Sequence, residues 1–267
     1  MKRSYKVGRL VGIYQTSQII KLFSCLLVLA LIVVGLPRQY VHADEPENME
    51  VNGDLLFETE GEPRERTLDE ILLENWKNYQ LEQSLLQTGN GLMGPVGPSY
   101  NVLGVPCYQQ INPYYCGPAS VKEVLQYKKG TSNTQSYYAS LLQTATTGAY
   151  PGTVKENIPG VLNSQLGYTH YVISNTSSFS LWKNRVENGI NNTFPIILDI
   201  ATNDNSMPYT TAGHFLVVSG FAFDPGNTTL ASVYVADPHP IYYGTAWYSA
   251  GTIWQANANH SQPAFIW

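Results

Sequence analysis

The segment VPCYQQINPYYCGPASVKEVLQY, Val105 to Tyr127, places a cysteine where a helix is expected to begin. Cys116 is followed by Gly117 and Pro118, and proline is favoured in the first turn of a helix. A thiol at that position meets unpaired backbone N–H groups and the positive end of the helix dipole, and both favour the thiolate. The segment therefore predicts a nucleophilic cysteine.

Upstream of this cysteine stands a glutamine that suits the same chemistry. Gln110 lies six residues before Cys116, which is close enough for its side-chain amide to return to the thiol. Together with the backbone N–H of Cys116, that amide would form an oxyanion hole. Gln109 is the neighbouring candidate, and the spacing favours Gln110.

A second cysteine, Cys107, lies nine residues before Cys116, and two interpretations of it stay open. In an oxidising exterior the two thiols could form a disulfide, which would silence the nucleophile. Otherwise Cys107 is a half-buried thiol on a strand. Two cysteines at this spacing match no usual zinc-ligand pattern, so the sequence implies no metal and no cofactor.

A nucleophilic cysteine also needs a general base, and the base needs an orienting partner. The candidate bases after the N-terminal leader are His170, His214, His239 and His260. His214 directly precedes the apolar run FLVVSGFAF (215–223), and the turn residues DPGN separate that run from LASVYVAD (230–237). Two such runs around a short turn predict a β-hairpin.

The register of this hairpin selects one histidine. If Phe223 pairs with Leu230, then Leu216 lies opposite Asp237. Residues two apart on a strand share a face, so His214 becomes a diagonal neighbour of Asp237, within reach of a hydrogen bond. The sequence therefore predicts a histidine–carboxylate pair.

Charge divides the chain into blocks. Residues 44–90 contain 13 acidic and three basic residues, whereas residues 91–267 contain seven acidic and six basic residues. The larger part is thus close to neutral and has no basic stripe. This composition argues against binding to nucleic acid.

The first 43 residues are typical of a signal peptide. A basic leader precedes the apolar run LFSCLLVLALIVVGL (22–36), and Val41-His42-Ala43 offers small residues for a signal peptidase. A run of 15 residues is shorter than the roughly 20 that a membrane-spanning helix needs. We expect residues 1–43 to be removed from a secreted, extracellular protein that has no stable membrane association afterwards. The alternative is an uncleaved anchor on the outer side of the membrane.

Residues 44–98 form an acidic segment with one predicted helix. Thr67 and Glu70 have the spacing of a capping box, and the breakers GNGLMGPVGP (89–98) should end the helix by Thr88. The predicted apolar stripe consists of Leu68, Ile71, Leu72, Trp76, Tyr79 and Leu86. Such a segment is either a prosegment that lies on the domain or a solvated linker.

Residues 99–267 remain as the main domain. Helical patterns occupy 118–129, 135–144, 154–165 and 180–191, and strand patterns occupy 194–201, 215–223 and 230–237. Helices followed by antiparallel strands indicate an α+β fold.

The order Gln110, Cys116, His214, Asp237 resembles that of the papain-like cysteine peptidases. More narrowly, VPCYQQINPYYCGPAS, GHFLVVSGF and VYVADP are similar to three motifs of the bacterial C39-like peptidases, over about residues 105–238. The resemblance implies a papain-like fold, with the nucleophile at a helix start in a helical N-terminal part and an antiparallel sheet in the C-terminal part. It also implies that Cys116 is the nucleophile, His214 the general base and acid, Asp237 its orienting partner and Gln110 the oxyanion donor.

On this basis we expect a secreted bacterial cysteine peptidase that hydrolyses peptide or protein substrates through a thioester on Cys116. Two alternatives stay open at this point. The thioester could pass to an amine, as in an acyltransferase or cross-linking enzyme. The domain could instead be a catalytically silent binding or adhesion module whose thiol is sealed by Cys107.

Overall fold

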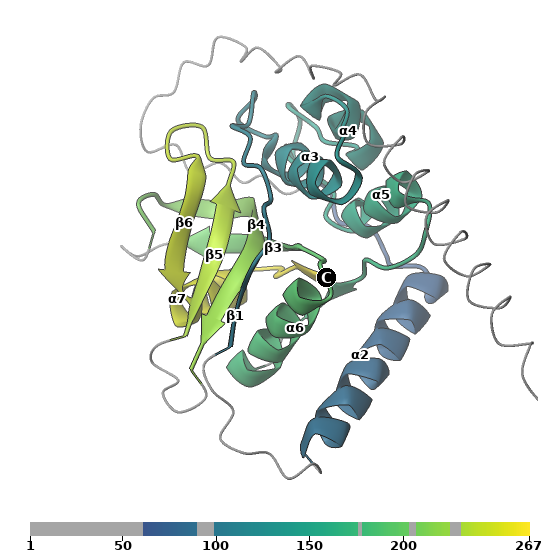
Figure 1. Ribbon diagram of the computed structural model, residues 1–267. Coiled ribbons are helices and arrows are strands. Elements are labelled where there is room, and N and C mark those ends of the chain that lie inside the picture. The colour runs from purple at the N-terminus through teal and green to yellow at the C-terminus, as the bar shows by residue number, and fades with distance from the viewer. Residues whose placement is uncertain (1–60, 90–98, 176–177, 203–206, 225–230) are drawn as a thin grey trace, which may run out of the picture. The chain divides into compact units, whose positions relative to one another are not determined.

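The structure, a computed structural model, describes residues 61–89, 99–175, 178–202, 207–224 and 231–267 (Figure 1). The predicted signal peptide and most of the acidic residues before the first helix lie outside the described residues. Within the described ranges, no helix has the length and apolar character needed to cross a bilayer.

Helices and one antiparallel sheet make up the described chain. In order, the elements are α2 (Leu68–Gly89), β1 (Ser99–Val102), α3 (Cys116–Lys129), α4 (Gln135–Leu142), α5 (Asn157–Leu166), β2 (Ile173–Ser174), α6 (Phe179–Asn191), β3 (Ile196–Thr202), β4 (Thr211–Phe223), β5 (Ser232–Asp237), β6 (Gly244–Ser249), α7 (Ala250–Asn259) and β7 (Phe265–Ile266). The strand order is β2-β7-β3-β4-β5-β6, and β1 pairs with β4. The predicted α+β class is confirmed, and every helix and strand predicted within residues 99–267 is present.

Helix α3 is the buried helix of the domain. It packs against α4, α5 and strand β4, and Figure 1 shows the three helices grouped together beside the sheet. All of its residues from Cys116 to Leu125 are buried. Gly117 is required by this packing, because a Cβ there would lie 2.5 Å from the Thr153 side chain. The helix ends at Gly130, whose left-handed backbone (φ 72°) favours glycine.

The predicted hairpin is formed by β4 and β5. Val217 pairs with Ala236 and Val218 pairs with Val235, which is the predicted register. The register shifts by one residue between Val218 and Gly220, so the predicted pairing does not extend to the turn. A bulge of this kind adds one unpaired residue to one strand. The half of the hairpin nearest Asp237 is therefore as predicted.

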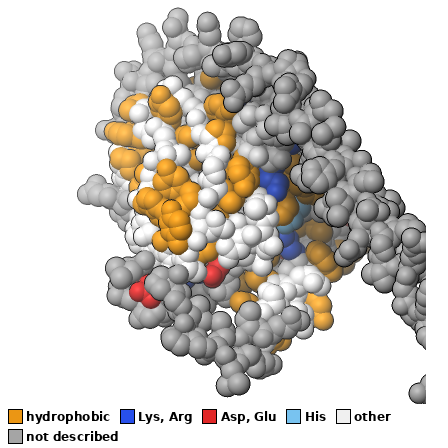
Figure 2. All heavy atoms as spheres, in the orientation of Figure 1, with side chains coloured by type: hydrophobic (Ala, Val, Ile, Leu, Met, Phe, Trp, Pro, Cys, Tyr) orange, Lys and Arg blue, Asp and Glu red, His pale blue; other side chains and the backbone are white. Residues whose placement is uncertain are grey.

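The outer face of the sheet carries exposed aromatic side chains. Tyr100 on β1 lies 5.9 Å from Trp247 on β6, and Tyr234 on β5 lies 5.1 Å from the same ring, measured between ring centroids. Figure 2 shows hydrophobic side chains gathered on the face that β5 and β6 present to the viewer. These rings contact one another and lie outside the buried core.

Helix α2 contacts the domain with a different face from the one that its apolar pattern predicts. The predicted capping box is present: Glu70 N–H donates to Thr67 Oγ1, and Thr67 N–H donates to Glu70 Oε2. The predicted stripe is exposed, however, with Leu68 at 69% and Trp76 at 60%. Lys77 and Leu81 are buried instead. The predicted helix is present, but its apolar stripe lies on the outer face because a lysine occupies the inner face.

Contacts made by the polar side chains of α2 explain this orientation. The Lys77 ammonium donates to His170 O at 3.1 Å and lies 4.3 Å above the centre of the Trp267 ring. Next to it, Asn78 Oδ1 accepts a hydrogen bond from Arg185 at 2.8 Å. A buried ammonium is tolerated when its protons have partners, and the aromatic ring adds a cation–π contact.

Candidate active site

The predicted histidine–carboxylate pair is formed. His214 comes from β4 and Asp237 from the end of β5, and His214 Nε2 lies 2.8 Å from Asp237 Oδ1. Both residues are 3% exposed. The hydrogen bond is therefore shielded from water, which strengthens it.

Asp237 accepts two further hydrogen bonds. The His239 backbone N–H donates to Oδ1 at 2.9 Å, and the Tyr209 hydroxyl donates to Oδ2 at 2.6 Å. Burial alone would raise the pKa of Asp237. The positive His214 ring and these donors outweigh burial and hold the pKa below its usual value. Asp237 is thus a buried carboxylate.

Cys116 meets the same histidine from the other side. The thiol is fully buried at the first residue of α3. Burial lowers the pKa of His214, but the charge of Asp237 and the hydrogen bonds with Asp237 and Cys116 raise it to about 10. Because Nε2 is engaged by Asp237, Nδ1 is the nitrogen left for the thiol. The ring therefore carries a proton at neutral pH and lies between a thiol and a carboxylate, as a thiolate–imidazolium pair requires.

Gln110 is buried beside these residues and has polar partners of its own. Its backbone N–H donates to Pro238 O at 2.8 Å, which ties the loop before α3 to the end of β5. Its Nε2 donates to Asn112 O and Pro113 O, each at 2.9 Å, and its Oε1 is buried without a partner among the described residues. The neighbouring Gln109 turns its amide to Pro240 O. Gln110 must release or share an N–H group to act as an oxyanion donor, and that role stays a prediction.

Cys107 and Cys116 form no disulfide with one another in the structure. The Cys107 thiol donates to Asp237 O at 3.2 Å and to Gly244 O at 3.4 Å. Burial and the neighbouring Glu123 raise its pKa, so the thiol holds its proton. Glu123 is itself buried, accepts the Tyr108 N–H at 2.8 Å, and has a pKa raised by burial to about 8. Cys107 therefore supports the backbone beneath Asp237.

The other candidate bases have different surroundings. His170 Nε2 lies 3.2 Å from the Lys77 ammonium. Burial and the positive charge of Lys77 lower the pKa of His170 to about 3. His260 Nε2 lies 3.7 Å from Asp199 Oδ1. His239 accepts the backbone N–H groups of the two residues Ile241 and Tyr242 through Nδ1. His214 is the histidine that joins Asp237 to Cys116, as the hairpin register predicted.

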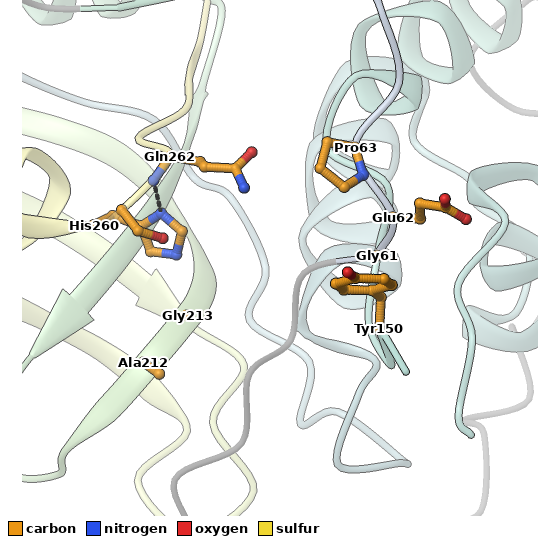
Figure 3. Close-up of a pocket in the computed structure, with 9 residues that line it drawn as sticks. Gly61, Glu62, Pro63, Tyr150, Ala212, Gly213, His260 and Gln262 are labelled. Carbon is orange, nitrogen blue, oxygen red and sulfur yellow. Dashed lines mark hydrogen bonds between the residues drawn. The ribbon is translucent and has the colours of Figure 1, made fainter. Parts of the chain in front are cut away.

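A cavity of about 390 Å³ has Gly213 in its lining, but none of Cys116, His214, Asp237 and Gln110 (Figure 3). Gly61, Glu62, Pro63 and Tyr150 form one wall, and Ala212, Gly213, His260 and Gln262 lie across from them. Gly213 directly precedes His214. On the wall that contains Gly61, the Gly61 N–H donates to Thr153 O at 2.9 Å. Thr153 in turn packs on Gly117, the residue after Cys116. The cavity is thus bounded partly by residues that precede α2.

Sequence reasoning missed Tyr209 among the residues that contact the pair. This side chain lies in the segment between β3 and β4, where no periodic pattern points to a strand or helix. Its partner Asp237 is 28 residues away in the chain. The register argument that found His214 does not extend to a residue outside the hairpin.

Cys116, His214 and Asp237 all lie in a part of the chain that matches the model of a known family. The model of the Peptidase_C39 like family matches residues 102–261, which is more than half of the chain. The chain belongs to this family. The predicted resemblance is therefore confirmed, and with it the C39-like fold.

Several solved structures are similar to this C39-like chain at low identity. A Bacillus anthracis protein assigned to the C39-like peptidases is 16% identical, with a TM-score of 0.46, over 63% of this chain and 96% of that one. The peptidase domain of Streptococcus ComA, a bi-functional ABC transporter involved in quorum sensing, is 18% identical, with a TM-score of 0.38, over 60% and 95%. A double glycine motif protease from an AMS/PCAT transporter, solved with its leader peptide, is 16% identical, with a TM-score of 0.38, over 64% and 96%. No curated protein is similar enough to this chain to count as a match.

Proposed function

We propose that this chain is a cysteine peptidase that hydrolyses peptide bonds through a thioester on Cys116. The observation that carries the proposal is the buried His214 ring, bonded to Asp237 through Nε2 and to the Cys116 thiol. Membership of a peptidase family supports the same reaction. Cys116, His214 and Asp237 are the proposed catalytic residues, and Gln110 is the proposed oxyanion donor.

The geometry suggests the order of proton transfers. The Cys116 thiolate attacks the carbonyl carbon, and the carbonyl oxygen becomes an oxyanion near the N-terminus of α3. His214 gives its proton to the leaving amine as the C–N bond breaks, which leaves a thioester. The neutral ring then takes a proton from water as the hydroxide attacks the thioester carbonyl; the C–S bond breaks, and the thiolate of Cys116 and the protonated His214 ring are restored. Asp237 holds the ring in place and stabilises its charged form.

Residues 1–43 support secretion, so the proposed substrates are peptides or proteins outside a bacterial cell. The unit that follows the proposed signal peptide is residues 44–267. The direct test is to incubate this unit with a peptide library under reducing conditions and to identify the products by mass spectrometry. Products that add water support a peptidase. Products that carry an added amine support the acyltransferase alternative, and no thiol-dependent product supports the binding module.

We further infer that residues 44–98 are a prosegment. Arg64 supports this inference because it donates to Glu156 O at 2.7 Å and to Asn157 Oδ1 at 2.8 Å, at the start of α5. The same guanidinium pairs with Glu70 at 2.6 Å, which joins the segment to the first turn of α2. Together with the Gly61 contact, these bonds hold residues 61–70 against Thr153, Glu156 and Asn157.

Replacing Gln110 tests the oxyanion role. We expect Gln110→Ala to lower kcat by about 10²- to 10³-fold, because one donor to the developing oxyanion is lost. Gln109→Ala is the matched control and should leave kcat unchanged, since its amide bonds Pro240 O. Steady-state kinetics on one peptide substrate compares the two. Equal effects of both variants would remove Gln110 from the mechanism.

The raised pKa of His214 gives an expected pH dependence. Below about pH 10 the ring carries the proton that the leaving amine needs, so kcat/KM should fall as pH rises through about 10. Alkylation of Cys116 by iodoacetamide should not fall in that range, because the thiolate persists when His214 is neutral. Both rates are measured on the same protein from pH 7 to 11. A decline of kcat/KM centred near pH 6.5 would mean that Asp237 does not hold the proton on His214.

A further inference from the structure

We infer that Tyr209 is a positioning residue of the candidate site: its hydroxyl fixes the Asp237 carboxylate so that the other oxygen faces His214. This inference rests on the proposed function, because it assigns Tyr209 a part in the same reaction. Tyr209 itself touches no reacting atom in the proposed mechanism and acts through Asp237.

The hydrogen bonds divide the two carboxylate oxygens between different partners. Oδ1 accepts from His214 Nε2 at 2.8 Å and from the His239 N–H at 2.9 Å. Oδ2 accepts from the Tyr209 hydroxyl at 2.6 Å, which is its sole donor within the described ranges. Three donors around one carboxylate leave it no freedom to rotate. Without the hydroxyl, Oδ2 would be a buried charged atom with no partner, which is costly.

The Tyr209 ring is also held, so its hydroxyl has a fixed direction. The ring stacks on His239 with 4.1 Å between centroids and meets the His214 ring edge-on at 5.5 Å. Tyr209 is 9% exposed. Burial raises the pKa of its hydroxyl well above the usual value, so the phenol keeps its proton and remains a donor at any working pH. The Tyr209 side chain therefore acts as a rigid hydrogen-bond donor that also covers the His214–Asp237 pair.

The same hydrogen bond also has a purely structural explanation: a buried tyrosine hydroxyl needs an acceptor, and Asp237 supplies it. The two explanations differ in what they expect of the carboxylate. If Tyr209 only satisfies its own hydroxyl, its loss changes stability alone. If it fixes Asp237, its loss also changes the pH at which Asp237 takes up a proton, because one hydrogen bond to the charged form is missing.

Several titratable groups face Asp237 from the elements packed around it, and each is unchanged in a tyrosine-to-phenylalanine variant. They are Glu123 on α3, Cys107 before it, His214 on β4, His239 after β5 and Tyr248 on β6, while Cys116 on α3 contacts His214. A shift in the pH dependence of Tyr209→Phe is therefore assigned to the lost hydroxyl.

The experiment measures Cys116 alkylation by iodoacetamide against pH in the full chain, with mass spectrometry separating Cys116 from Cys107 and Cys25. We expect the acid limb of this profile to move to lower pH in Tyr209→Phe, by up to about one unit, and kcat for peptide hydrolysis to fall about tenfold with little change in KM. Asp237 then takes up its proton at a higher pH, while the His214 ring stays protonated in that acid range, so less negative charge opposes formation of the Cys116 thiolate. Tyr234→Phe is the matched control, because its hydroxyl bonds Thr245 Oγ1 at 2.7 Å on the outer face of the sheet.

An unshifted acid limb in Tyr209→Phe would overturn the inference. A second comparison covers the case in which the variant folds poorly: in an Asp237→Asn background, Tyr209→Phe should add no further loss of alkylation rate, because residues that act as a unit are not additive. An additive loss would mean that Tyr209 does not act through Asp237. Alkylation needs no peptide substrate, so a chain with the expected profile but no hydrolysis would contradict the proposed function and leave the Tyr209 inference standing.

Discussion

Replacing Cys116 by alanine is expected to lower peptide hydrolysis by about 10⁴-fold or more, because the thioester cannot form. The fold should be retained. Cys116 is fully buried at the start of α3, and its replacement by alanine removes only the sulfur atom from an already small side chain. The expected loss of unfolding free energy is about 1 kcal/mol, the central value for point substitutions. Steady-state kinetics and thermal unfolding of the same preparations measure the two effects separately.

Cys107→Ala is the matched control for this variant. Its thiol bonds Asp237 O and Gly244 O and does not contact the proposed reacting atoms, so hydrolysis in reducing buffer should be retained. Loss of activity in Cys107→Ala together with full activity in Cys116→Ala would show that Cys107, and not Cys116, is the nucleophile. Activity that rises when unaltered protein is reduced would support an inhibitory disulfide between the two, which the structure does not contain.

The candidate site was predictable where local rules apply. Cys116 could be placed because Gly117 and Pro118 indicate a helix start, and α3 begins at Cys116. The pair of His214 and Asp237 followed from the two-residue period of strands. The register shift after Val218 was not predictable, because a bulge depends on how β5 packs between β4 and β6.

Other elements have no local signal that a sequence could reveal. Strands β2 and β7 contain two residues each, which is too short for an alternating pattern. The sequence of β6 begins at Gly244 and is largely polar at its start, and α7 contains glycine and asparagine, which are poor helix formers. These elements form because the chain completes a sheet and covers it. Tertiary packing decides them.

The orientation of α2 shows the same limit. Lysine is almost never fully buried unless it is paired, and Lys77 is not one of the apolar residues of the predicted stripe. Its partners are His170 O and the Trp267 ring, which lie far along the chain. Exposed Leu68 and Trp76 then occupy the opposite face. Helical periodicity identifies the helix but not which face lies inward when a buried cation has distant partners.

The second large effect is expected from Gly61→Ala, which should raise hydrolysis by about 5- to 30-fold if residues 44–98 are a prosegment. A Cβ at Gly61 would lie 2.7 Å from Val154 N and 2.9 Å from Thr153 C, distances at which the backbone must move apart. The collision weakens the hydrogen bond from Gly61 N–H to Thr153 O, and a change of one or two kcal/mol shifts an equilibrium by that factor. Gly61, Glu62 and Pro63, which line the cavity, would then move away from Thr153 and Val154.

The matched control is Gly104→Ala, since a Cβ at Gly104 meets no atom within 4 Å. Hydrolysis of one peptide is measured for both variants, together with the rate at which trypsin cleaves after Arg64. That cleavage should become faster in Gly61→Ala alone, because Arg64 is held by Glu70, Asn157 and the Glu156 carbonyl only while the segment stays in place. Faster trypsin cleavage without faster hydrolysis would show that the segment detaches but does not block the site, and residues 44–98 would then be a linker. If neither peptide hydrolysis nor trypsin cleavage changes in Gly61→Ala, the contact at Gly61 does not hold the segment.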